Sequence, residues 1–142
     1  MKTYNSLEEI TRLIEGFENG SWPAAEWTHQ AHLTMGVWYL SKHCVPDATK
    51  LIRDGIKKYN VASGGQNTET RGYHETITLF YIWYIKKYLT SVSPDRSLVE
   101  LTNHFLEFHD DKNLPFEFYG NDLLMSAEAR RDWVEPDLKS LS

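Results

Sequence analysis

Apolar residues recur at helical spacing along most of the chain, and this periodicity restricts its fold more than any other feature. The first apolar stripe starts behind a capping box formed by Ser6 and Glu9, and it comprises Leu7, Ile10, Leu13, Ile14 and Phe17. Further stretches with Pro, Ser, Thr or Asp start signals follow it. The first helix is predicted over 6–18, and the second begins between 23 and 28 and ends at 43. The third follows 46–47 and ends at 60, and the fourth spans 73–89. The fifth follows 93–95 and ends at 108, and a short sixth helix spans 121–133. The absence of sustained strand-type alternation predicts an all-α fold, a helical bundle of five to six helices.

A weak internal repeat suggests how these helices are paired. Placing His29 over His74 also places 38–42 over 83–87 and, after three extra linker residues, 46–47 over 94–95. Both halves then consist of two helices joined by a short Pro-Asp turn, which predicts two helical hairpins in an up-down-up-down arrangement. In such a bundle the second and fourth helices are parallel, so His29 and His74 are expected at the same end.

Composition and charge restrict the class of protein. The 142 residues are 41% hydrophobic and 25% charged, which suits a single all-α domain, 1–142, with one core. The net charge of -5 and the scattered basic residues argue against nucleic acid as a partner. The longest apolar stretches, 33–40 and 77–85, are too short to span a membrane, and the N-terminus has no apolar secretion signal. Cys44 is the single cysteine, so a cytoplasmic protein without an internal disulfide is expected.

Three histidines are the strongest candidates for a functional site. His29 and His32 are three residues apart on the apolar face of the second helix, and His74 begins the fourth helix. Imidazoles with one or two carboxylates and an open position are the ligand set of a catalytic Zn, Mn or Fe site, so His29, His32, His74 and Glu26 are predicted metal ligands. Glu26 lies on the same helix as His29 only if that helix begins near Pro23 instead of at an N-cap on Thr28.

The same residues could act without a metal. Histidine titrates near neutral pH, so a general acid and base could come from His29, His74 and Glu75. Tyr73, Thr78 and Arg130 are predicted substrate contacts, with Arg130 suited to an anionic group.

The loop over 61–72 is unusually long for a bundle and contains two adjacent glycines. It lacks the Gly-Lys-Ser ending of a phosphate-binding P-loop. Because the loop leads directly into the segment that contains His74, we expect it to cover the histidine end of the bundle.

Three functions follow from these residues. The first is a metal-dependent or histidine acid/base enzyme that acts on a small molecule. The second is a non-catalytic module that binds or senses a small ligand. The third is a protein-interaction domain with structural histidines, and a homo-oligomer is compatible with all three.

Four strings carry a resemblance to a known group of proteins. They are EWTHQAHL at 26–33, GYHETIT at 72–78, SAEAR at 126–130 and WVEPD at 133–137. With them the chain resembles, from about Phe17 to Leu138, a family of small bacterial proteins that has no assigned reaction. In general style it also resembles the DinB-like helical bundles, which hold a metal with three histidines, but the His-x-x-x-His pair of that family is absent here.

Overall fold

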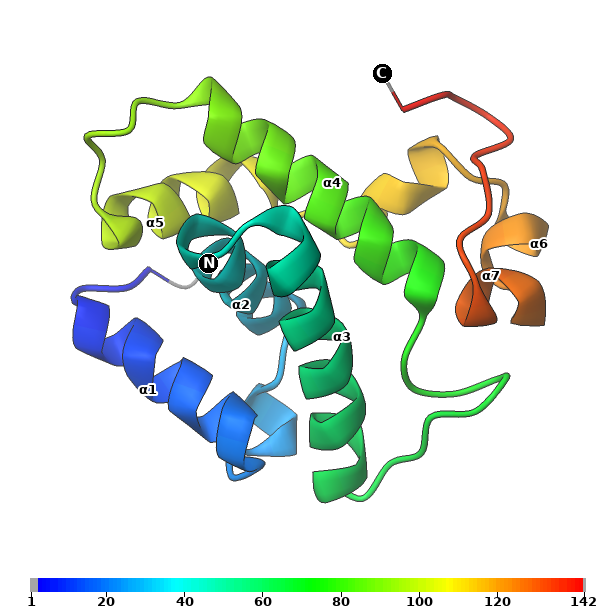
Figure 1. Cartoon of the computed structure of the whole chain (residues 1–142), viewed down its shortest axis with the longest axis horizontal. Coiled ribbons are helices and arrows are strands. Elements are labelled where there is room, and N and C mark those ends of the chain that lie inside the picture. The colour runs from blue at the N-terminus through cyan, green and yellow to red at the C-terminus, as the bar shows by residue number, and fades with distance from the viewer. Residues whose placement is uncertain (1–2, 142) are drawn as a thin grey trace.

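The computed structural model describes residues 3–141, and these residues form a packed all-helical bundle (Figure 1). They contain seven α-helices, two short 3₁₀ helices and no strand, which confirms the all-α prediction. The α-helices are α1 (Leu7–Asn19), α2 (His29–Lys42), α3 (Val45–Ala62), α4 (Glu75–Ser91), α5 (Leu98–His109), α6 (Asn121–Leu124) and α7 (Ala127–Arg131). The 3₁₀ helices are η1 (Ala24–Glu26) and η2 (Leu114–Glu117). No helix among the described residues is long and apolar enough to cross a membrane.

The predicted start and stop signals of α1 are confirmed. The Ser6 hydroxyl accepts a hydrogen bond from the backbone N–H of Glu9, and the Glu9 carboxylate accepts one from the backbone N–H of Asn5. Gly20 follows the helix with a left-handed φ of 78°, a conformation that glycine adopts without steric cost. Local sequence therefore defines both ends of this helix.

The start of α2 lies at the later of the two predicted positions. Thr28 is the N-cap, and its hydroxyl accepts a hydrogen bond from the backbone N–H of Ala31 at 3.2 Å. The preceding turn is the separate helix η1, which contains Glu26. Glu26 and His29 therefore do not share one helix.

The remaining helices match the predicted segments, with one division. The predicted sixth helix over 121–133 is two short helices, α6 and α7, because Ser126 interrupts it. The Ser126 hydroxyl accepts a hydrogen bond from the backbone N–H of Ala129 and so caps a new helix.

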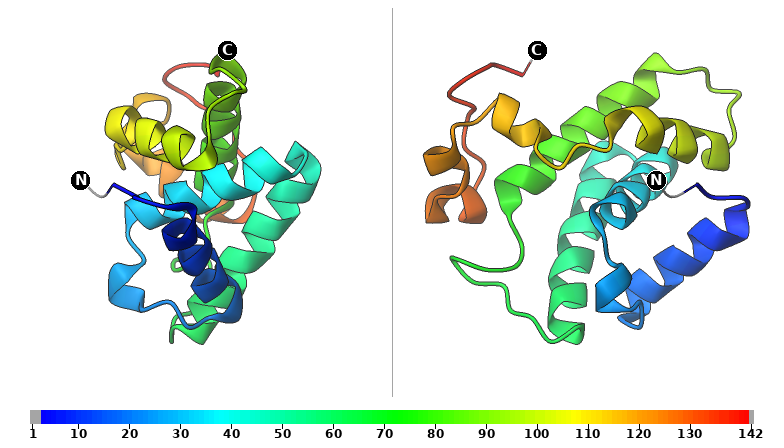
Figure 2. Two further views of the ribbon diagram at one scale, coloured as in Figure 1. Left: turned by 90° about the vertical axis from the view of Figure 1, so that its left-hand side faces the viewer. Right: turned by 180° about the vertical axis from the view of Figure 1, so that it is seen from behind.

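Helix α2 lies at the centre of the bundle, where it contacts α1, α3, α4 and α5. Its partners contribute large buried side chains to the main core, including Phe17, Tyr59, Ile85 and Phe105. A second apolar cluster, built on Phe80, attaches the C-terminal segments to α4. Figure 2 shows these C-terminal segments beside the part of α4 that follows the 61–72 loop.

Helices α2 and α4 pack against each other and cross: in Figure 1, α2 is seen nearly end-on while α4 lies in the plane of the picture. The ring of His29 lies 5.5 Å from that of Tyr81, and further along both helices Gly36 lies against Ile85. The start of α2 therefore lies against the middle of α4.

Candidate functional site

An apolar cavity of about 340 Å³ lies between α2, α3 and α4, and we call it the histidine pocket. Aliphatic side chains form most of its wall: Leu33, Met35, Ile52, Ile56, Ile77, Ile82 and Ile85. The polar or charged side chains that line it are His29, His32, Thr78, Tyr81 and Lys112. Its size and its mostly apolar wall with a few polar groups are typical of a small-molecule site.

The hydrogen bond of His32 determines which of its ring nitrogens can accept a proton. Its Nδ1 lies 2.8 Å from the carbonyl oxygen of Thr28, and since a carbonyl only accepts, Nδ1 is the donor. Burial lowers the pKa of His32, which favours the neutral ring. In that tautomer Nε2 carries a lone pair, and no described residue donates a hydrogen bond to it. The ring is held against Trp27, with centroids 4.3 Å apart.

His29 is the second histidine of this pocket. Burial lowers its pKa, although the nearby Asp110 carboxylate opposes that effect. Its Nε2 atom is buried without a hydrogen-bond partner in the described structure and lies 3.9 Å from Oδ1 of Asp110. The other carboxylate oxygen of Asp110 accepts a hydrogen bond from the Gln30 side chain at 2.6 Å. His29 is therefore adjacent to a fixed carboxylate but not bonded to it.

The two hydroxyl groups that line the pocket already use their hydrogens. Thr78 donates to the carbonyl oxygen of His74 at 2.7 Å, and Tyr81 donates to that of Asp111 at 3.1 Å. Their oxygens can accept further hydrogen bonds but have no hydrogen left to donate. Like His32, they offer acceptors to a ligand.

His74 does not line the histidine pocket. Both of its ring nitrogens form hydrogen bonds with backbone groups instead. It is the N-cap of α4, where Nδ1 accepts a hydrogen bond from the backbone N–H of Ile77 at 3.1 Å. Its Nε2 lies 2.7 Å from the carbonyl oxygen of Leu124, to which it donates. Burial lowers the pKa of this ring as well. His74 thus joins α4 to the C-terminal segment.

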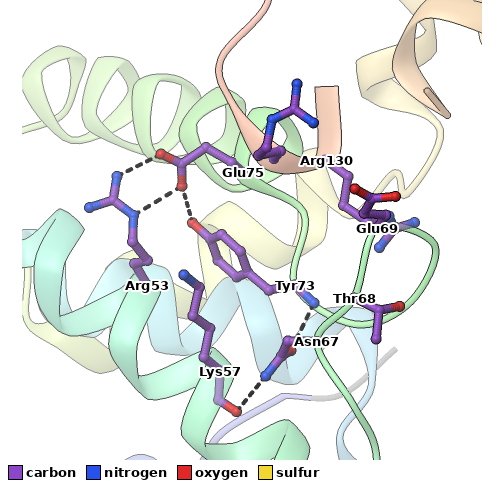
Figure 3. A pocket seen from close by; sticks show the side chains of 9 residues that line it. Arg53, Lys57, Asn67, Thr68, Glu69, Tyr73, Glu75 and Arg130 are labelled. Carbon is purple, nitrogen blue, oxygen red and sulfur yellow. Dashed lines mark hydrogen bonds and ion pairs between the residues drawn. The ribbon is translucent and has the colours of Figure 1, made fainter. Parts of the chain in front are cut away.

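Glu75 and Tyr73 lie in a different cavity, which we call the cationic cleft (Figure 3). Arg53 of α3 donates two hydrogen bonds to the Glu75 carboxylate, at 3.0 and 2.8 Å, and the Tyr73 hydroxyl donates a third at 2.5 Å. Burial acts to raise the pKa of Glu75, but the hydrogen bonds from Arg53 and Tyr73 hold it below its ordinary value. Glu75 is therefore an ionised member of a structural network.

The remaining candidates are also outside the histidine pocket. Arg130 lines the cationic cleft and donates a hydrogen bond to the carbonyl oxygen of Gly72 at 2.8 Å. Glu26 is exposed and lines a separate cavity beside α1. The loop over 61–72, predicted to cover the histidine end, contributes Asn67, Thr68 and Glu69 to the cationic cleft instead.

The structure thus separates the predicted site residues: Glu26 lines the cavity beside α1, and His74 lines neither the histidine pocket nor the cationic cleft. The histidine pocket contains His29, His32 and Thr78, whereas the cationic cleft contains Tyr73, Glu75 and Arg130. Within residues 3–141, no three His, Cys, Asp or Glu side chains are arranged to hold a metal ion.

Sequence reasoning missed several residues of these cavities. Arg53 and Lys57 on α3 line the cationic cleft, and their spacing of four residues is the one signal that would have placed them on the same helix face. Asp110 follows the end of α5, and nothing in the sequence connects it with His29.

Comparisons of the chain with family models, with curated proteins and with solved structures return no match.

Proposed function

We propose that the protein binds a small, largely apolar molecule that carries a hydrogen-bond donor, and that the histidine pocket is the binding site. The observation that carries this proposal is the unshared Nε2 lone pair of His32, a ring that lines an apolar cavity. A ligand hydroxyl or amine would supply the hydrogen-bond partner that this nitrogen lacks among the described residues.

The other polar groups of the pocket support the same ligand class. Thr78 and Tyr81 have committed their hydrogens to backbone carbonyls, so they too can only accept. A ligand with a donor group meets acceptors at His32, Thr78 and Tyr81, whereas a ligand with only acceptors is left with Lys112 and the N–H of His29. The aliphatic wall selects for an apolar body.

Binding fits this pocket better than catalysis does. A neutral histidine with a free lone pair could act as a general base, which supports histidine acid/base catalysis as the second candidate function. Abstraction of a proton leaves negative charge on the substrate, and that charge needs donors to stabilise it. The donors that line this pocket are the Lys112 ammonium and the single N–H of a neutral His29 ring, whereas its other polar groups accept. A non-catalytic binding module is therefore our first choice.

The divalent metal stays a separate prediction. To join His29 and His32 around a Zn, Mn or Fe ion, His74 would have to give up its hydrogen bonds to Ile77 and Leu124. Glu26, on η1, would have to reach across from another cavity.

Phenol and benzene are matched probes for this proposal, because they differ by a single hydroxyl group and both are small enough for the pocket. We expect phenol to bind saturably and about three- to tenfold more tightly than benzene, the contribution of one hydrogen bond. Binding is measured by NMR shifts of the Ala31, His32 and Thr78 amides, and by the fluorescence of Trp27, whose ring packs on His32.

The variant His32→Leu removes the acceptor and keeps an apolar side chain against Trp27. It should abolish the preference for phenol, whereas His43→Leu, an exposed histidine after the other end of α2, should retain it. Absence of saturable phenol binding to the wild-type protein, or an unchanged preference in His32→Leu, would contradict the proposal.

A further inference from the structure

The cationic cleft is a second cavity, of about 520 Å³, that the proposed function does not use. It is bounded by α3, the loop over 61–72, the start of α4 and helix α7 (Figure 3). Its charged lining side chains are Arg53, Lys57, Arg130 and Arg131 against Glu69 and Glu75. An excess of positive charge therefore gathers at one place on a chain whose net charge is -5.

Part of this charge is already neutralised. Arg53 and Glu75 form a bidentate ion pair, with the two side chains 33% and 16% exposed, and this pair builds one wall of the cleft. Arg131 pairs with Asp132, but both side chains are more than half exposed, so the pair is weak in water.

Two cations of the cleft lack an acidic partner. No ion pair among residues 3–141 includes Lys57 or Arg130. Arg130 donates to the Gly72 carbonyl, which fixes the guanidinium without cancelling its charge. The Lys57 ammonium lies 5.0 Å from the centroid of the Tyr73 ring, a contact that also leaves it positive.

The loop adds a neutral donor. The Thr68 hydroxyl accepts hydrogen bonds from the backbone N–H groups of Thr70 and Arg71, so its own hydrogen is available to a ligand. The Asn67 side chain bonds to the Lys57 carbonyl and the Tyr73 N–H, which fixes this part of the loop against α3. The Thr68 hydroxyl is thus held beside α3 before a ligand arrives.

We propose that the cationic cleft binds the phosphate group of a small molecule, with Lys57, Arg130 and Thr68 as its donors. A phosphate group carries up to two negative charges and several acceptor oxygens, which match the two unpaired cations and the number of donors better than a carboxylate does. The Glu69 carboxylate also lines the cleft and opposes an anion, so Lys57 and Arg130 have to outweigh it. Helix α4 begins at Glu75, which lines the cleft, and the positive end of its dipole favours an anion there. The volume leaves room for the remainder of the molecule.

Inorganic phosphate is the probe that tests this site. It is titrated at pH 7.5 into the full chain, with sodium chloride adjusted so that ionic strength stays constant, and binding is followed by NMR shifts of the Thr68 and Gly72 amides. We expect saturable binding that weakens about tenfold or more in Lys57→Gln and in Arg130→Gln, as expected for the loss of a charge-assisted hydrogen bond. Acetate should bind at least tenfold more weakly than phosphate.

Lys58→Gln is the matched control, because Lys58 is the next residue on α3, is exposed and does not line the cleft. It should leave phosphate affinity unchanged, and circular dichroism should show that each variant is folded. A wild-type protein without saturable binding, an equal loss in Lys58→Gln, or acetate binding as tight as phosphate binding would overturn the proposal. The phenol experiment reports on a different cavity, so the two proposals can fail separately.

Discussion

His74 and His32 both lie at helix N-termini, yet their hydrogen bonds give them different roles. Both ring nitrogens of His74 are bonded to the backbone, one to Ile77 and one to Leu124. His32 uses Nδ1 alone, and its Nε2 has no hydrogen-bond donor among the described residues. At the scale of single residues, the hydrogen-bond partners of each imidazole ring therefore distinguish a structural histidine from a candidate for function.

This difference predicts that His74→Ala lowers the free energy of unfolding by about 2–3 kcal/mol. The loss combines about 1 kcal/mol for the N-cap with about 1–2 kcal/mol for the buried bond to Leu124. Urea unfolding at pH 7.5 measures the change. His74→Asn is the matched variant, because an asparagine can cap α4 but does not reach Leu124, and about 1 kcal/mol should be recovered. Equal stability of His74→Ala and the wild type would show that these bonds contribute little.

At the scale of elements, the close approach of α1 and α3 depends on Gly55. A Cβ atom at this position would lie 2.7 Å from Cζ of Phe17 and 2.8 Å from its Cε2 atom. Phe17 is buried and stacks on Trp27, with centroids 5.0 Å apart, and Trp27 in turn packs on His32. The helix crossing thus supports the wall of the histidine pocket.

Gly55→Ala should therefore destabilise the protein by about 1–3 kcal/mol, although alanine favours a helix by about 1 kcal/mol over glycine. Trp27 fluorescence should change at the same time, because Phe17 has to move. Lys58→Ala, on the exposed face of the same helix, should change the free energy of unfolding by less than about 0.5 kcal/mol in the same urea assay. If Gly55→Ala were the more stable protein, α1 and α3 would have room that the structure does not show.

At the scale of the whole molecule, the free energy of unfolding depends on pH through several histidines whose pKa values are shifted in the same direction. Burial lowers the pKa values of His29, His32, His74 and His109 in the folded state, and it is the largest effect on each of them. Below an ordinary histidine pKa of about 6.5, the unfolded chain then binds protons more readily than the folded one.

The free energy of unfolding should therefore be nearly constant above about pH 7 and fall as the pH drops from 6.5 toward 5. Urea unfolding at pH 7.5, 6.5 and 5.5 checks this expectation. The decrease should be smaller in His74→Asn, which lacks one of the titrating rings. Stability that rises on acidification through this range would contradict the assignment of these rings as neutral in the folded state.

Local sequence determined the helices of this protein, because caps and apolar stripes act over three or four residues. Ser6, Thr28 and Ser126 each accept a bond from a backbone N–H three residues later, although the break at Ser126 was not predicted. His29, His32 and Thr78 could be placed together from helix faces alone. The rest of the site depended on partners far apart in sequence. His74 and Leu124 are 50 positions apart and Arg53 and Glu75 are 22 apart, so only tertiary packing decided that these candidates belong to a cap and an ion pair.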